Sequence, residues 1–139
     1  MHVERDVAHL FTGKDLAGTT IGFAYVGTVC KESGTTCGSS GDTAYALSES
    51  RFEGASFERR VALTAHEFGH GWNATHCDET EDCRTMCSDI GGCTGELESF
   101  GPVATAEIVE FKSLRTCLDA GVAAVAAPFF DDFPTTNLD

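Results

Sequence analysis

The residues best suited to chemistry lie close together near the middle of the sequence, in the stretch AHEFGHGWNATH at positions 65–76. His66 and His70 are four residues apart, so on a helix their imidazoles project from one face and can reach a single ion. His76 follows six residues later, and a continuing helix would carry it away by about 1.5 Å per residue. The chain must therefore turn back to present His76, and Asn73 tolerates the left-handed conformation that such a turn needs.

This set of side chains is typical of a catalytic zinc site. Zinc binds imidazole nitrogen at about 2.0–2.1 Å, and three histidines leave its fourth position open for water. Glu67 lies one step around the helix, where its carboxylate can sit beside that water without binding the metal. The alternative is a buried helix whose histidines bond backbone groups, but chance gives this spacing in only about one of 2,000 such chains. We predict that His66, His70 and His76 bind one zinc ion and that Glu67 is the general base and acid.

Helices are predicted where apolar residues recur at intervals of three and four. Residues 56–72 form the principal helix, which carries the zinc motif. Residues 105–118 form a second helix, whose apolar side is made of Ile108, Val109, Phe111, Leu114 and Leu118. Residues 4–11 show the same spacing and stop before a glycine, which predicts the last turns of a further helix.

Strands and loops are indicated elsewhere. Residues 19–29 are apolar, β-branched and aromatic, with two glycines where another backbone can approach closely, and they predict a strand. Residues 43–47 could form a second short strand, after a loop rich in Gly, Ser and Thr at 30–42. After Cys117 the composition changes, and we interpret residues 120–139 as a linker or the start of a following domain.

Length, charge and hydropathy exclude several classes of protein. The chain has 139 residues, 42 % of them hydrophobic, which suits one domain or part of one. Its formal charge of −13 argues against binding to nucleic acid, since Arg59-Arg60 is the largest basic cluster. No run reaches the roughly 20 apolar residues of a membrane-spanning helix, so no membrane span is expected.

Seven cysteines in so short a chain predict disulfide bonds formed outside the reducing cytosol. A cytosolic protein with reduced thiols is the alternative. The first residues carry no apolar run, so we expect a signal peptide upstream and a longer secreted precursor. Four cysteines lie close together: Cys77, Cys83, Cys87 and Cys93. They allow three disulfide pairings. They could instead bind a second zinc ion, but the absence of a C-x-x-C pair disfavours this alternative.

The spacing HExxHxxxxxH resembles that of the metzincin metallopeptidases. Residues 9–16 and 21–30 are similar to the segments that precede the active-site helix in the adamalysin (reprolysin, ADAM-like) family. Asn73 stands where that family commonly has Gly, and it is similar to the ADAMTS branch. The run Thr85-Met86-Cys87-Ser88 resembles the family's Met-turn, whose methionine packs beneath the zinc site. The resemblance covers roughly residues 5–119.

This resemblance implies an α/β (α+β) fold of the metzincin type. We expect a mixed, partly truncated β-sheet, an active-site helix, a Met-turn and a C-terminal helix. Residues 1–119 would be the catalytic domain without its N-terminal part. One local departure stands out, because Cys77 occupies the place where the family usually has Asp, and Asp78 follows it.

The resemblance also implies roles for residues outside the zinc motif. Met86 would support the site from below, and Cys30 would pair with Cys117, leaving Cys37 without a partner in this chain. A calcium ion near Cys117 and Asp119 is a further candidate. Substrate would lie extended, by strand addition, along the strand made of Gly22, Phe23, Ala24, Tyr25 and Val26. Ordinary core packing explains the residues of that strand equally well.

The resulting hypothesis is a secreted, monomeric zinc endopeptidase that hydrolyses peptide bonds in protein or peptide substrates. The alternative is a secreted, non-catalytic binding domain that keeps the zinc scaffold, and the intact Glu67 weighs against it. A third interpretation is that the truncated domain does not fold stably alone.

Overall fold

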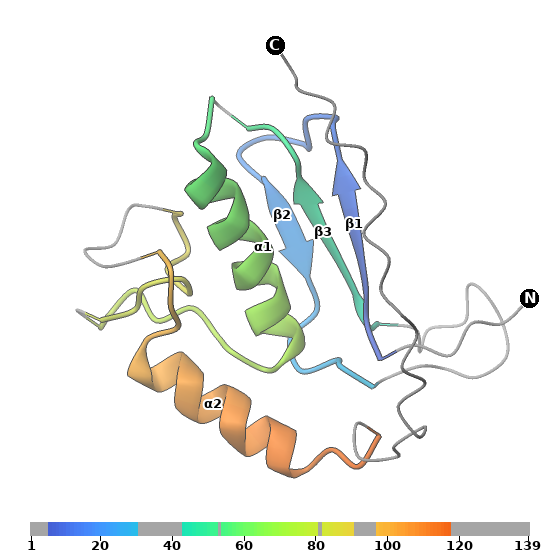
Figure 1. Ribbon diagram of the computed structural model, residues 1–139, viewed down its shortest axis with the longest axis vertical. Helices are drawn as coiled ribbons and strands as arrows, with labels where there is room; N and C mark the ends of the chain where they lie inside the picture. Colours follow the sequence, from blue (N-terminus) through green and yellow to red (C-terminus); the bar gives the residue numbers. More distant parts are fainter. Residues whose placement is uncertain (1–5, 31–42, 53, 81, 91–96, 118–139) are drawn as a thin grey trace, which may run out of the picture.

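A small mixed sheet and two helices make up the part of the chain that the structure describes, residues 6–30, 43–52, 54–80, 82–90 and 97–117 of the computed structural model. The strands and helices, in chain order, are β1 (Ala8–Thr12), β2 (Gly22–Ala24), β3 (Tyr45–Glu49), α1 (Phe57–Gly71) and α2 (Pro102–Ser113). The sheet has the order β1-β3-β2, with β1 parallel and β2 antiparallel to β3 (Figure 1). This arrangement confirms the expected α+β class with a mixed sheet.

Helix α1 packs against one face of the sheet, over β2 and β3 (Figure 1). It begins after Ser56, whose hydroxyl oxygen accepts a hydrogen bond from the backbone N–H of Arg59, a common N-cap arrangement. Ala46 and Ser48 of β3 are buried, as alternate residues on the covered face of a strand should be. The expected principal helix over residues 56–72 is therefore confirmed, within one residue at each end.

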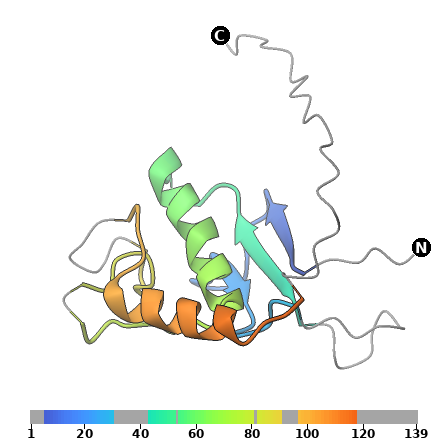
Figure 2. The same cartoon turned by 60° about the horizontal axis from the view of Figure 1, so that its bottom comes forward.

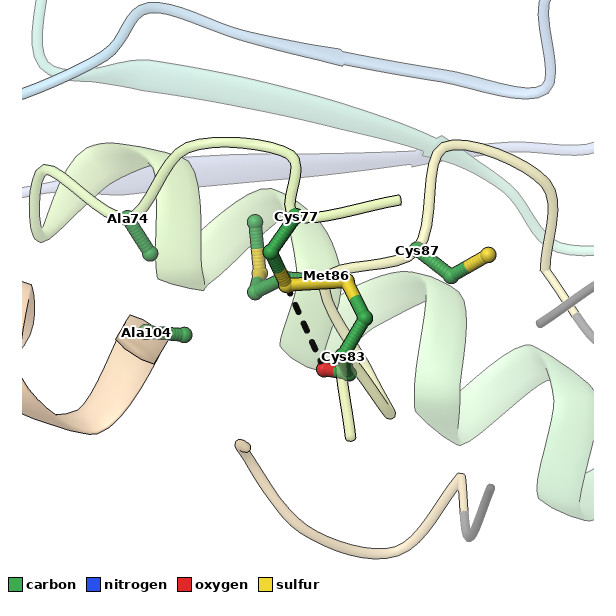
Figure 3. Close-up of a cluster of buried hydrophobic side chains, with 6 residues drawn as sticks. All are labelled: Ala74, Cys77, Cys83, Met86, Cys87 and Ala104. Atoms are coloured by element: carbon green, nitrogen blue, oxygen red, sulfur yellow. Dashed lines mark hydrogen bonds between the residues drawn. A yellow bond between two sulfur atoms is a disulfide. The ribbon is translucent and has the colours of Figure 1, made fainter. Parts of the chain in front are cut away.

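Helix α2 crosses near the C-terminal end of α1, and the first part of the loop that follows α1 lies beside both helices (Figure 2). The apolar cluster in this region consists of Ala74, Cys77, Cys83, Met86, Cys87 and Ala104 (Figure 3). Gly101, the residue before α2, lies against the backbone carbonyl of Asp82. A Cβ atom at this position would overlap the carbonyl oxygen. A second cluster lies toward the N-terminal half of α1 and contains Phe52, Ala62, Leu63 and Ile90.

The predicted helix over residues 4–11 is wrong, because its described part forms strand β1. The parallel pairing with β3, in which Ala8 lies opposite Tyr45, supplies backbone hydrogen bonds that a few isolated helical turns would lack. On this strand the ring of His9 stacks on Phe68 of α1, with 5.0 Å between centroids, and its Nε2 bonds the hydroxyl of Ser48.

The expected strand over residues 19–29 is also too long, since only β2 pairs. Gly27 and Cys30 have positive φ angles of 65° and 66°, which break an extended strand. The amides of Thr28 and Val29 instead donate to the carbonyl of Gly71 at the end of α1. The predicted strand at 43–47 lies two residues further on, as β3.

The second helix is shifted toward the N-terminus relative to the expected range of 105–118. Pro102 occupies its first turn, where a missing N–H costs nothing, and the helix ends at Ser113. The expected apolar side is only partly correct. Phe111 is buried, but Val109 and Leu114 are 60 % and 72 % exposed, and Leu118 lies outside the described residues.

Candidate metal centre and peptide cleft

Three histidines converge at the C-terminal end of α1. His66 and His70 project from the buried side of the helix, one turn apart. The chain then leaves the helix through Asn73, whose φ of 75° is left-handed, and its amide donates to the carbonyl of His70. This turn brings His76 back, so that the three Nε2 atoms lie 3.0, 3.1 and 3.2 Å from one another.

Backbone carbonyls orient two of the three rings. Nδ1 of His66 lies 2.8 Å from the carbonyl oxygen of Thr85, and Nδ1 of His70 lies 2.8 Å from that of Ala74. A carbonyl can only accept, so each Nδ1 carries the proton and donates it, which leaves the Nε2 lone pair free. Burial lowers the pKa of His66 to about 4 and also lowers the pKa of His70, which keeps both rings neutral.

The donor set fits a zinc ion. Nitrogen atoms bound tetrahedrally at about 2.0–2.1 Å lie about 3.3 Å apart, close to the separations of the three Nε2 atoms. Neutral imidazoles with free Nε2 lone pairs, fixed by hydrogen bonds at Nδ1, are the usual form of zinc-binding histidine. His66, His70 and His76 could therefore hold one metal ion together.

Glu67 is a buried carboxylate beside this centre. Its side chain is only 4 % exposed, and burial raises its pKa to about 7. Strand β2 approaches it closely at Gly22, where a Cβ atom would overlap Oε1 of Glu67 and come within 2.9 Å of Leu63. Glycine at this position thus allows the strand and the helix to enclose the carboxylate.

A cavity of about 320 Å³ joins these groups to the edge of the sheet. The three histidines and Glu67 line it on one side, and residues 19–24 line it on the other. Strand β2 is one of the two outer strands of the sheet, and its outer edge pairs with no strand among the described residues, so this edge can accept an extended peptide. Of the expected substrate-binding residues, Gly22, Phe23 and Ala24 line the cavity, whereas Tyr25 and Val26 follow the strand and are exposed.

Met86 lies underneath the centre, fully buried. A Cβ atom at Gly69, between two of the histidines, would lie 2.5 Å from the sulfur of Met86 and 2.8 Å from a ring carbon of Phe100. The preceding residue, Thr85, supplies the carbonyl that orients His66. One short segment therefore packs below the three histidines and also orients the ring of His66.

The loop after the third histidine is crosslinked. Cys77 forms a disulfide with Cys83, visible in Figure 3, and Cys87 is disulfide-bonded as well, so their sulfurs are not available as zinc ligands. Asp78 follows, and its Oδ1 accepts a hydrogen bond of 2.7 Å from the amide of Ser88. The carboxylate that follows Cys77 is thus tied to the segment that contains Met86. Cys93 and Cys37 lie outside the described residues.

A further disulfide joins Cys30, after β2, to Cys117, after α2. The carboxylate of Asp6 lies within 4.8 Å of both sulfur atoms, a neighbour that residue spacing did not indicate. Asp119, named with Cys117 as a calcium candidate, lies outside the described residues, so calcium binding there stays a prediction.

The residue types and their spacing did not indicate the backbone carbonyls that orient the histidines, nor one side chain of α2 that lies near them. The carbonyls of Thr85 and Ala74 could not be found, because every residue carries a carbonyl and only the fold selects two of them. Glu107 of α2 bonds Thr75, the residue before His76, and nothing in its local sequence sets it apart from other helical glutamates.

Comparison of the sequence with models of known protein families gives a match to a metallopeptidase family. The model of the reprolysin-like metallopeptidases of family M12B matches residues 2–100. This range contains the whole of the histidine motif and the Met86 segment. No curated protein matches the chain.

Proposed function

The chain belongs to the reprolysin-like metallopeptidases of family M12B, and from this premise we propose that it is a secreted, zinc-dependent endopeptidase in which Glu67 is the general base. The observation that carries the proposal is the convergence of three Nε2 atoms beside a buried carboxylate in one cavity. A site that only stored or sensed metal would have no use for a buried glutamate that lines the cavity and has no hydrogen-bond partner among the described residues.

The residues of the cleft would have different roles in hydrolysis. His66, His70 and His76 would hold zinc, which supplies Lewis-acid activation of water and of the scissile carbonyl when bound. Glu67 accepts a proton from the attacking water and delivers it to the leaving amine, so that the same carboxylate acts first as base and then as acid. A carboxylate shielded from bulk water suits this exchange.

The free edge of β2 would position the substrate. An extended peptide added to this edge forms backbone hydrogen bonds irrespective of its sequence, which suits protein or peptide substrates. Leu63, Ile21 and Ile90 give the adjoining wall of the cavity an apolar character. We expect the enzyme to act as a monomer.

Disulfide bonds support a location outside the reducing cytosol. None of the described helices is long and apolar enough to cross a membrane. We assign residues 1–119 to the catalytic domain and residues 120–139 to a linker or the start of a following domain. Residues 118–139 lie outside the described residues.

The test combines zinc stoichiometry with cleavage of a denatured protein, for the wild type, Glu67→Ala and the control Glu110→Ala. Glu110 is an exposed carboxylate of α2, so its removal makes the same change in charge away from the cleft. We expect one zinc per chain in all three and cleavage by all but Glu67→Ala. Zinc without cleavage in the wild type would favour a non-catalytic binding domain, and no zinc at all would refute the proposed site.

A further inference from the structure

His76 differs from the other two histidines in how its ring is held. Nδ1 of His66 and Nδ1 of His70 each bond a carbonyl, but among the described residues Nδ1 of His76 has no hydrogen-bond partner. His76 is also exposed, whereas the other two are buried. Its position must therefore come from the backbone on either side of it.

Both neighbours of His76 are anchored. On the far side, Cys77 is held by its disulfide with Cys83. On the near side, Thr75 is held by Glu107, which lies 32 residues further along the chain in α2. Oε2 of Glu107 accepts from the amide of Thr75 at 2.9 Å, and Oε1 accepts from its hydroxyl at 3.0 Å. Both carboxylate oxygens of Glu107 are used, so the bond fixes orientation as well as distance.

From these contacts we propose that Glu107 is a positioning residue for the metal centre, which acts through Thr75 to hold His76 in place. The inference rests on the proposed zinc site. Glu107 does not line the cavity and is not a ligand. Its effect should therefore fall on metal affinity and on the geometry of the centre, and not on contact with substrate.

The magnitude follows from the role of groups that support metal ligands. Removing such a partner typically weakens metal affinity by about 10–100-fold. The bonds to Thr75 are on the surface and one residue away from the ligand, so we expect the lower end for Glu107→Ala, about tenfold. Thr75→Val removes only the hydroxyl bond and should have a smaller effect, whereas Thr75→Ser keeps that donor and should behave as the wild type.

The experiment measures the zinc dissociation constant of the full-length, disulfide-bonded protein by competition with a chromophoric chelator. The variants are Glu107→Ala, Thr75→Val, Thr75→Ser and the control Glu110→Ala, whose carboxylate lies on the same helix and makes no hydrogen bond among the described residues. Thermal unfolding of each zinc-free variant separates metal positioning from simple loss of stability. With zinc saturating, kcat should fall in Glu107→Ala while KM stays unchanged.

The outcomes are distinct. Weaker zinc binding in Glu107→Ala and Thr75→Val, but not in Thr75→Ser or Glu110→Ala, supports the inference. A dissociation constant for Glu107→Ala within twofold of Glu110→Ala overturns it and leaves the proposed function intact. If Glu107→Ala does not fold, equal affinities of Thr75→Val and Thr75→Ser overturn the inference. Absence of zinc binding in the wild type overturns the proposed function and this inference together.

Discussion

The wild type, with the buried carboxylate of Glu67, should be less stable than a variant with a neutral residue at this position. The difference in the free energy of unfolding should depend on pH. Burial raises the pKa of this side chain from its ordinary 4.5 to about 7 in the zinc-free protein. The folded chain therefore binds the proton more tightly than the unfolded chain does. Well below pH 4.5 the carboxyl is protonated in both states, and no cost arises. Well above pH 7 it is ionised in both states, and the folded state bears the full cost of a buried charge.

The structure gives the size of this cost. Each pH unit between the two pKa values corresponds to about 1.4 kcal/mol, so the upper limit above pH 7 is about 3 kcal/mol. Glu67→Gln keeps the shape of the side chain and removes the charge. We expect the zinc-free variant to exceed the wild type in free energy of unfolding by up to about 3 kcal/mol at pH 8 and by less than about 0.5 kcal/mol at pH 4.5, where half of the unfolded chains have lost this proton.

The assay is urea unfolding of the zinc-free proteins at several values between pH 4.5 and 8, with Glu110→Gln as the exposed control. A gain in stability that grows between pH 4.5 and 7 for Glu67→Gln alone would agree with the reasoning. Equal stability of the wild type and Glu67→Gln at pH 8, or a gain of the same size at both ends of the range, would refute it. The expected gain would show that the wild type retains a destabilising carboxylate at its centre, as active sites often do.

Two glycines provide further predictions, with Gly13→Ala as the common control because a Cβ atom there meets nothing within 4 Å. Gly22→Ala places its methyl group against Oε1 of Glu67, so cleavage of a denatured protein should fall at least tenfold while one zinc per chain remains bound. Unchanged cleavage would contradict the close approach of β2 to Glu67. Gly101→Ala would overlap the backbone oxygen of Asp82, which cannot rotate away as a side chain could, so urea unfolding should show a loss of about 3 kcal/mol or more. A midpoint equal to that of Gly13→Ala would show that the backbone before α2 moves aside freely.

The sequence by itself determined which histidines converge at the end of α1. The interval from His66 to His70 matches one helical turn, and a strongly periodic segment of 15 residues fixes the helix that carries them. The left-handed turn at Asn73 also followed from residue type, because few residues other than glycine adopt that conformation easily. These features depend on neighbours within one or two turns, so local spacing is sufficient to predict them.

The tertiary structure alone decided what surrounds that motif. Residues 8–12 have a spacing compatible with a helix, and only the pairing with β3 makes them a strand. Likewise, the carbonyls that orient His66 and His70 are backbone groups, and Glu107 reaches Thr75 across 32 residues of chain. Such contacts join segments distant in sequence, and their partners are chosen by packing and not by local pattern. For that reason the three histidines that converge could be predicted from the sequence, whereas the groups that hold them in place could not.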